Sequence, residues 1–408
     1  MADLQLFLLI FPFSSIFAVL PAATPLQPVV NALNSTLPIL SLIYLVLMNK
    51  QDLSIGNCTV LFIYLAYLSV SLIWVDDGMK DNSFNFILRT LFTVIQTFVI
   101  VKVLEEQPDG LMDTLKKLAI LVAILCFLFL KLFPAESTWT NEDNGRMQSF
   151  FSAPNNMGQF LAFAFLIVNF YKRSEIPLPL LAVLDLMLVY LFLQCDSMTS
   201  LGGIVLISVC FRFKFLLKPL FIGIVIAGLI VPHINKLKKD TALENVGLGS
   251  RDLTFTGRTE VWDILLHDLD NRHRTAFGFG WGGYWVVDNI DRENPITSVS
   301  ELDWDPGQGH NGYLDTMVMA GIFGLVIFVI FLFDNVRFIF KNIGFDKQIV
   351  YLFTLIIMFN NITEASFFRA KHWYFVLLML TYWYARIKVK PSTVPSAAVD
   401  EQGSLAMS

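Results

Sequence analysis

Apolar residues fill most of the chain in long runs that short polar segments separate. A helical run of about 17–25 apolar residues is long enough to cross the hydrocarbon core of a bilayer, and we count about twelve such runs. Their approximate bounds are Leu4–Leu20, Val29–Met48, Gly56–Trp74, Phe84–Leu104, Leu115–Phe133, Asn155–Tyr171, Pro177–Gln194, Thr199–Phe211, Leu216–Val231, Tyr313–Phe333, Gln348–Asn361 and His372–Ile387. The pattern predicts an all-α polytopic membrane protein with about twelve transmembrane helices.

One polar stretch is much longer than the others and divides the chain. The predicted organisation is a helix bundle of about nine spans in residues 1–231, a large loop in 232–312, three last spans in 313–388 and a tail in 389–408. The tail is rich in Pro, Ser and Ala, so we expect it to be disordered. The loop is rich in aromatic residues, which need burial or a ligand, and we expect it to be folded and functional.

Basic residues fix the predicted orientation, because Lys and Arg accumulate in cytoplasmic loops. Taken over alternate loops, one side of the membrane holds fifteen Lys and Arg residues, and the short loops of the other side hold five. Both termini are therefore predicted to be cytoplasmic and the loop 232–312 to lie outside the cytoplasm.

Composition agrees with this assignment and excludes several classes of site. Hydrophobic residues make up 55% of the 408, and the mean hydropathy is +0.61. The four cysteines all lie outside the loop 232–312, so the loop has no disulfide, and their spacing matches no metal site. No sequence typical of a nucleotide or metal site is present, and nothing indicates nucleic-acid binding.

The large loop contains three distinct segments. Residues Arg258–Asp270 have apolar side chains at helical spacing and predict a short amphipathic helix. A glycine–aromatic run, Phe277 to Trp285, follows and predicts a mobile or tightly turned platform of rings. Last, His310 and Asn311 stand directly before the next span, at the rim of the bilayer.

Arg258 is the first candidate for chemistry. A guanidinium in the first turn of a helix adds bidentate donors to backbone N–H groups that already attract anions, so the natural ligand is a phosphate. The alternative is an exposed arginine that pairs with Glu260 or Asp263.

His310 is the second candidate. A histidine at the water-facing rim is suited to proton transfer at neutral pH. The alternative is a capping or interfacial histidine, in which case the loop carboxylates Asp303, Asp305 and Asp315 are the candidate bases.

Two charges fall inside predicted spans, where charges are costly and usually functional. Arg89 lies toward the outer half of its span and is placed to reach a lipid-linked phosphate. The alternative is an ion pair between Arg89 and Asp185.

Several segments occur in an order that is typical of one family. They are Ser71 to Trp74, Arg146 through Phe150 to Pro154-Asn155, Thr256-Gly257-Arg258 with Trp262, Gly278-Phe279-Gly280, and His310-Asn311-Gly312-Tyr313-Leu314-Asp315 before Gly321. In this order and topology, most of the chain resembles the O-antigen ligase and polysaccharide polymerase superfamily of bacterial envelopes. The form of the Arg258 and His310 segments is most similar to exopolysaccharide polymerases of the succinoglycan type.

The resemblance implies a GT-C-like membrane glycosyltransferase in the bacterial inner membrane, with the large loop in the periplasm. The implied donor is undecaprenyl-diphosphate-linked oligosaccharide, with Arg258 at the diphosphate and His310 beside the acceptor hydroxyl of a glycan. Relatives often carry a basic residue where this chain has Met198, which leaves Arg89 or Arg146 as the second phosphate ligand.

Further expectations follow from the chemistry. Arginines replace a divalent ion, so no metal or other cofactor is expected, and a single displacement inverts the anomeric carbon. Trp262, Trp281, Trp285 and Asn311 are candidate substrate-binding residues. Indole rings such as those of Trp281 and Trp285 are suited to stack on sugar faces. A flippase and chain-length or export proteins are candidate partners. The alternatives are a ligase that passes glycan to lipid A core or protein, and a transporter of the same lipids.

The orientation makes a direct prediction. In a version of the chain without cysteines, a single cysteine at Asn289 should react with a membrane-impermeant thiol reagent in whole cells, and one at Lys341 should be protected. Equal labelling of both positions would contradict the predicted topology.

Overall fold

The computed structural model describes most of the chain between residues 57 and 386. The described residues are 57–104, 110–138, 145–233, 258–285, 307–342, 348–369 and 372–386, with scattered positions between 39 and 47. The first predicted span, most of the second and the predicted disordered tail lie outside them.

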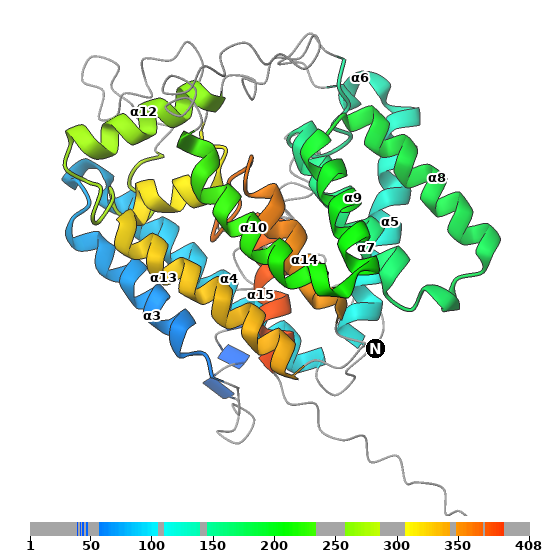
Figure 1. Cartoon of the computed structure of the whole chain (residues 1–408), viewed down its shortest axis with the longest axis horizontal. Coiled ribbons are helices and arrows are strands. Elements are labelled where there is room, and N and C mark those ends of the chain that lie inside the picture. Colours follow the sequence, from blue (N-terminus) through cyan, green and yellow to red (C-terminus); the bar gives the residue numbers. More distant parts are fainter. Residues whose placement is uncertain are drawn as a thin grey trace, which may run out of the picture.

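Helices make up the described part of the chain, joined by short turns and with no strand among them (Figure 1). They are α3 Thr59–Val70, α4 Lys80–Leu104, α5 Gly110–Leu132, α6 Pro134–Ser137, α7 Pro154–Phe170, α8 Leu178–Cys195, α9 Met198–Arg212, α10 Leu217–Ile230, α12 Arg258–Asn271, α13 Gly312–Asn342, α14 Gln348–Asn360 and α15 Trp373–Arg386. Ten predicted spans coincide with ten of these helices, and the predicted amphipathic helix coincides with α12. The all-α prediction is confirmed for these segments.

Four helical segments are long and apolar enough to cross a membrane. They are Asp77–Leu104, Leu178–Cys195, Lys214–His233 and Gly312–Phe340, and α3, α9 and α14 belong to shorter apolar helices. Helix α8 has an apolar outer face, on which Leu178, Leu186 and Leu193 are each about 70% exposed. An apolar face of this kind is stable against lipid and unfavourable in water.

The centre of the bundle is formed by α14 and α15, shown in orange and red in Figure 1. Nearly every side chain of both helices is buried, which agrees with sequences that are apolar all round rather than on one face. Helix α15 packs against α4, and α14 packs against α7 and α9. The segment 361–369, between these two helices, is therefore held on a rigid support.

Helix α13 is interrupted at Gly321, where the backbone takes φ 68° and ψ −175°. The start of the glycine–aromatic run fills the break: Ile322 N–H donates to the Thr275 carbonyl at 2.9 Å, and Phe279 N–H donates to the Val318 carbonyl at 2.9 Å. The backbone groups that the break frees are thus satisfied by the loop, as a low-dielectric surrounding requires. The run is tightly turned and packed into the bundle.

Alanine at Gly321 should therefore destabilise the protein. Its φ is unfavourable for any residue with a side chain, and a Cβ there would overlap the Ala276 carbonyl. We expect Gly321→Ala to lower the apparent Tm in detergent by more than about 4 °C. Gly223→Ala in α10, where a Cβ meets open space, is the matched control and should leave the Tm unchanged or raise it slightly. Equal Tm values for the two variants would show that the break tolerates a side chain.

Candidate functional site

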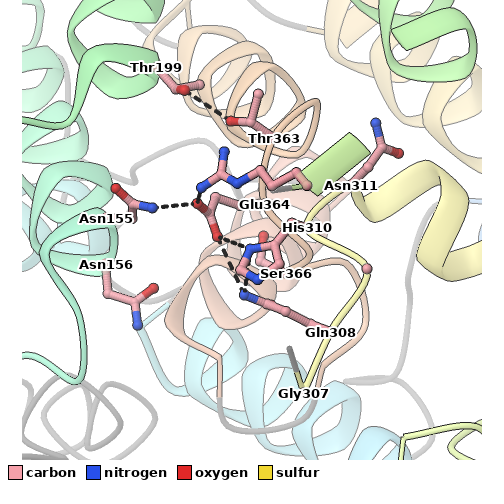
Figure 2. A network of polar contacts seen from close by, with 12 residues as sticks. Asn155, Asn156, Thr199, Gly307, Gln308, His310, Asn311, Thr363, Glu364 and Ser366 are labelled. Carbon is pink, nitrogen blue, oxygen red and sulfur yellow. Dashed lines mark hydrogen bonds and ion pairs between the residues drawn. The ribbon is translucent and has the colours of Figure 1, made fainter. Parts of the chain in front are cut away.

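Glu364 is the centre of a polar cluster that joins four separate parts of the chain (Figure 2). Its Oε1 accepts a hydrogen bond from Arg258 Nη2 at 2.7 Å, in an ion pair, and another from Asn155 Nδ2 at 2.7 Å. Its Oε2 lies 3.6 Å from His310 Nδ1 and 3.4 Å from Gln308 Nε2. The residues come from the start of α12, the start of α7, the loop before α13 and the loop between α14 and α15.

Burial and charge act in opposite directions on Glu364. Its side chain is 9% exposed, and such burial by itself raises the pKa of a carboxyl group. The charge of Arg258, the hydrogen bond and charge of His310 and the amide of Asn155 outweigh that effect and lower the pKa from 4.5 to about 2. Glu364 is therefore ionised at neutral pH, next to two groups that the sequence predicts for phosphate and proton chemistry.

The loop that carries Glu364 is rigid because its own polar groups are paired. Asn361 Oδ1 accepts the Ser366 N–H at 2.8 Å, and its carbonyl accepts the Gly312 N–H at 2.8 Å. Phe367 and Phe368 of the same loop are buried in the core. The carboxylate is thus held in place by the start of α13 and by apolar anchors.

His310 has an unusual backbone conformation. Its φ is 47°, in the left-handed region, which costs a non-glycine residue on the order of 1 kcal/mol. The next residue, Asn311, is completely buried: its Nδ2 donates to the Gly228 and Ile362 carbonyls, and its Oδ1 accepts the Leu314 N–H. These three bonds hold Asn311 in place directly after His310, and its side chain has no exposed surface in this structure.

A second arginine reaches the cluster through Asn155. Arg146 Nη2 donates to Asn155 Oδ1 at 2.7 Å, and Arg146 Nε donates to the Cys195 carbonyl at 3.2 Å. Arginine only donates and an ionised carboxylate only accepts, so the amide of Asn155 has a single orientation between them. The result is a chain from Arg146 through Asn155 and Glu364 to Arg258, with a cation at each end.

The three tryptophans predicted for substrate binding lie in packed surroundings. Trp262 and Trp281 are completely buried, and Trp262 Nε1 donates to the Gly309 carbonyl at 2.7 Å. Trp281 packs against Tyr64 and Phe86. Trp285 is half-buried and donates from Nε1 to Asp315 at 2.6 Å, so it is the one of the three with part of its surface open to a ligand.

Arg89 and Asp185 are apart from the cluster. Arg89 is on an exposed face of α4, and Asp185 of α8 accepts a hydrogen bond from Asn169 Nδ2 at 2.8 Å. Among the described ion pairs, none joins these two residues. Met198 is the exposed first residue of α9.

Sequence analysis missed Glu364 and Gln308. Glu364 stands in a short polar segment between the last two apolar runs, and an acidic residue at that position is a usable signal. Asp303 and Asp305, the other predicted bases, lie outside the described residues. Within the described ranges, no three His, Cys, Asp or Glu side chains are grouped as a metal site.

The ionised state of Glu364 predicts a pH-dependent stability. Because the folded-state pKa is below the ordinary value of 4.5, the stabilisation is complete above pH 4.5 and is lost as the pH falls through about 2. Glu364→Gln should lower the free energy of unfolding by on the order of 3 kcal/mol at neutral pH. Below pH 4.5 the difference in unfolding free energy between the variant and the wild type should become smaller. Thermal unfolding across this pH range measures the difference.

Glu260→Gln, at an exposed position of α12, is the control and should change the Tm at neutral pH far less than Glu364→Gln does. A Glu364→Gln difference that is constant with pH would mean that the charge of Glu364 does not stabilise the fold.

Comparison with known proteins adds no family to this geometry. No family model matches the chain, and a search of curated proteins finds no match. The function of the cluster therefore has to be inferred from its own residues and from the resemblance in the sequence.

Proposed function

We propose that the chain is a membrane glycosyltransferase that uses undecaprenyl-diphosphate-linked oligosaccharide and joins repeat units into an exopolysaccharide or O-antigen. The observation that carries the proposal is the meeting of Arg258 and His310 at Glu364, although 51 residues separate the two in the sequence. A phosphate-binding cation beside a proton-transfer group is the pair that transfer from a lipid diphosphate needs.

The two arginines suit the leaving group. Transfer breaks the bond between the sugar anomeric carbon and the diphosphate, so negative charge grows on the leaving oxygen. Arg258 and Arg146 lie at the two ends of the hydrogen-bonded chain through Asn155 and Glu364, and in the proposed reaction they stabilise that charge more in the transition state than in the ground state. The contact with Glu364 uses Nη2, one of the nitrogens of a guanidinium that has five N–H donors for recognising anions.

His310 and Glu364 suit the acceptor. An ionised carboxylate near Nδ1 favours the imidazole tautomer that takes a proton at Nε2, and it stabilises the imidazolium that then forms. The acceptor hydroxyl gives its proton to His310 as its oxygen attacks the anomeric carbon, and the diphosphate leaves. One displacement of this kind inverts the configuration, and it uses no metal.

The finer topology belongs to the same proposal. It comprises about twelve transmembrane helices in a GT-C-like arrangement, both termini in the cytoplasm, the loop 232–312 in the periplasm and the bacterial inner membrane as location. The excess of Lys and Arg in one set of loops supports this orientation. The proposed partners are the lipid-linked donor, a glycan acceptor, the bilayer, a flippase and chain-length or export proteins, with no nucleic acid.

A ligase and a transporter are the competing functions. A ligase passes finished glycan to lipid A core or protein through the same chemistry, and the identity of the acceptor separates it from a polymerase. Transporters place their sites near the bilayer midplane. The cluster here lies at the ends of α7, α12 and α13, which favours an enzyme.

Transfer by the purified protein alone tests the proposal, with lipid-linked oligosaccharide as donor and product length as the readout. We expect activity in excess EDTA. Transfer that is lost in EDTA and restored by magnesium or manganese would overturn the metal-free mechanism, and no transfer at all would favour a transporter.

Arg258→Lys should lower transfer by at least about tenfold, which corresponds to about 1.4 kcal/mol of transition-state stabilisation. Lysine keeps the charge but loses the planar fork that binds Glu364 and a phosphate together. Arg272→Lys, at an exposed position just after α12, is the control and should keep wild-type turnover. Wild-type turnover in Arg258→Lys would remove Arg258 from the site.

A further inference from the structure

Asp315, in the first turn of α13, is buried at the junction of three segments. Its Oδ1 accepts the Gly309 N–H at 3.0 Å and the Trp285 Nε1–H at 2.6 Å. Its Oδ2 pairs with Arg369 Nη2 at 3.2 Å. The carboxylate therefore connects the glycine–aromatic run, the loop before α13 and the loop between α14 and α15.

Two of these contacts hold the loop directly before His310. Gly309, which precedes His310, has its N–H held by Asp315 and its carbonyl held by Trp262. Arg369 donates from the same Nη2 to the Gly307 carbonyl at 3.2 Å, so Asp315 is also connected to Gly307 through Arg369. The loop is thus fixed at Gly307 and at Gly309, and Asn311 fixes the other side of His310.

The same ion pair connects His310 to Glu364. Arg369 belongs to the loop that carries Glu364, five residues further along the chain. Asp315 thereby links the two loops whose separation sets the contact between His310 Nδ1 and Glu364 Oε2. Its own side chain is 4% exposed and has three partners, which suits a structural acceptor better than a base open to substrate.

We propose that Asp315 is a positioning residue: it holds Gly309, directly before the left-handed His310, and ties that loop, through Arg369, to the loop of Glu364. Its effect on catalysis rests on the function proposed above. Its effect on the placement of His310 does not depend on that function.

The first test measures the placement of His310 without any substrate. Diethylpyrocarbonate modifies accessible imidazoles, and peptide mass spectrometry reports the rate at His310 separately from the other four histidines. Asp315→Ala removes all three acceptor contacts, so His310 should react at least about fivefold faster as its loop opens more often. Asp315→Asn keeps an acceptor oxygen but loses the charge that holds Arg369, and it should give a smaller increase.

Asp334→Ala is the matched control. Asp334 lies on the same helix and pairs with the buried Arg386 at 2.6 Å, near the other end of α13. Its loss should lower the Tm and leave both the His310 modification rate and transfer within about twofold of wild type. An unchanged His310 rate in Asp315→Asn, which keeps the shape of the side chain, would overturn the proposal even if Asp315→Ala does not fold.

The second test uses transfer and a double-mutant cycle. Asp315→Asn should lower kcat by about tenfold with little change in the KM for the donor, since Arg258 and Arg146 are untouched. In the His310→Gln background the same substitution should change transfer, measured over a single turnover, by less than about twofold. An equal loss in both backgrounds would show that Asp315 does not act through His310. Absence of transfer by the wild-type protein would instead overturn the proposed function and leave the modification test intact.

Discussion

The pairing of the buried Glu364 carboxylate is the constraint on which the site depends. A charge removed from water is costly unless opposite charges and hydrogen bonds surround it, so Arg258, Asn155 and His310 must all converge on it. Arg258 is the first residue of α12, Asn155 is in the first turn of α7, and His310 lies just before α13. One carboxylate thus fixes where three helices start relative to one another, all at the same end of the bundle.

The break in α13 solves a related problem for the backbone. At Gly321 the helix gives up hydrogen bonds, and the segment after α12 replaces them with its own backbone groups. These backbone bonds hold the segment after α12 against α13, and the bond from Trp262 to Gly309 holds the loop before α13 against α12. The polar cluster therefore rests on a loop that is part of the helical core, which suits a site whose groups must keep their geometry during a reaction.

Burial and hydrogen bonding divide the residues of the cluster into two groups. Asn311 and Asp315 are buried and fully engaged with backbone and side-chain partners, whereas Arg258 and His310 keep 14% and 18% of their side chains exposed. The first pair suits positioning, and the second pair suits contact with a ligand. This division agrees with a reaction in which a cation and a base act on a lipid-linked substrate at the edge of the membrane.

The sequence by itself determined the described helices and singled out three members of the polar cluster: Arg258, His310 and Arg146. Apolar runs and amphipathic spacing follow from local chemistry, so ten predicted spans overlap ten helices and one predicted amphipathic helix matches α12. The largest difference is at α13, which ends at Asn342 instead of Phe333. Tertiary structure alone decided that Glu364 joins them, that Trp262 and Trp281 are packed inside, and that Asp185 bonds to Asn169 instead of Arg89. The reason is physical: periodicity records which side chains avoid water, whereas the pairing of buried charges depends on contacts between segments that lie far apart in the sequence.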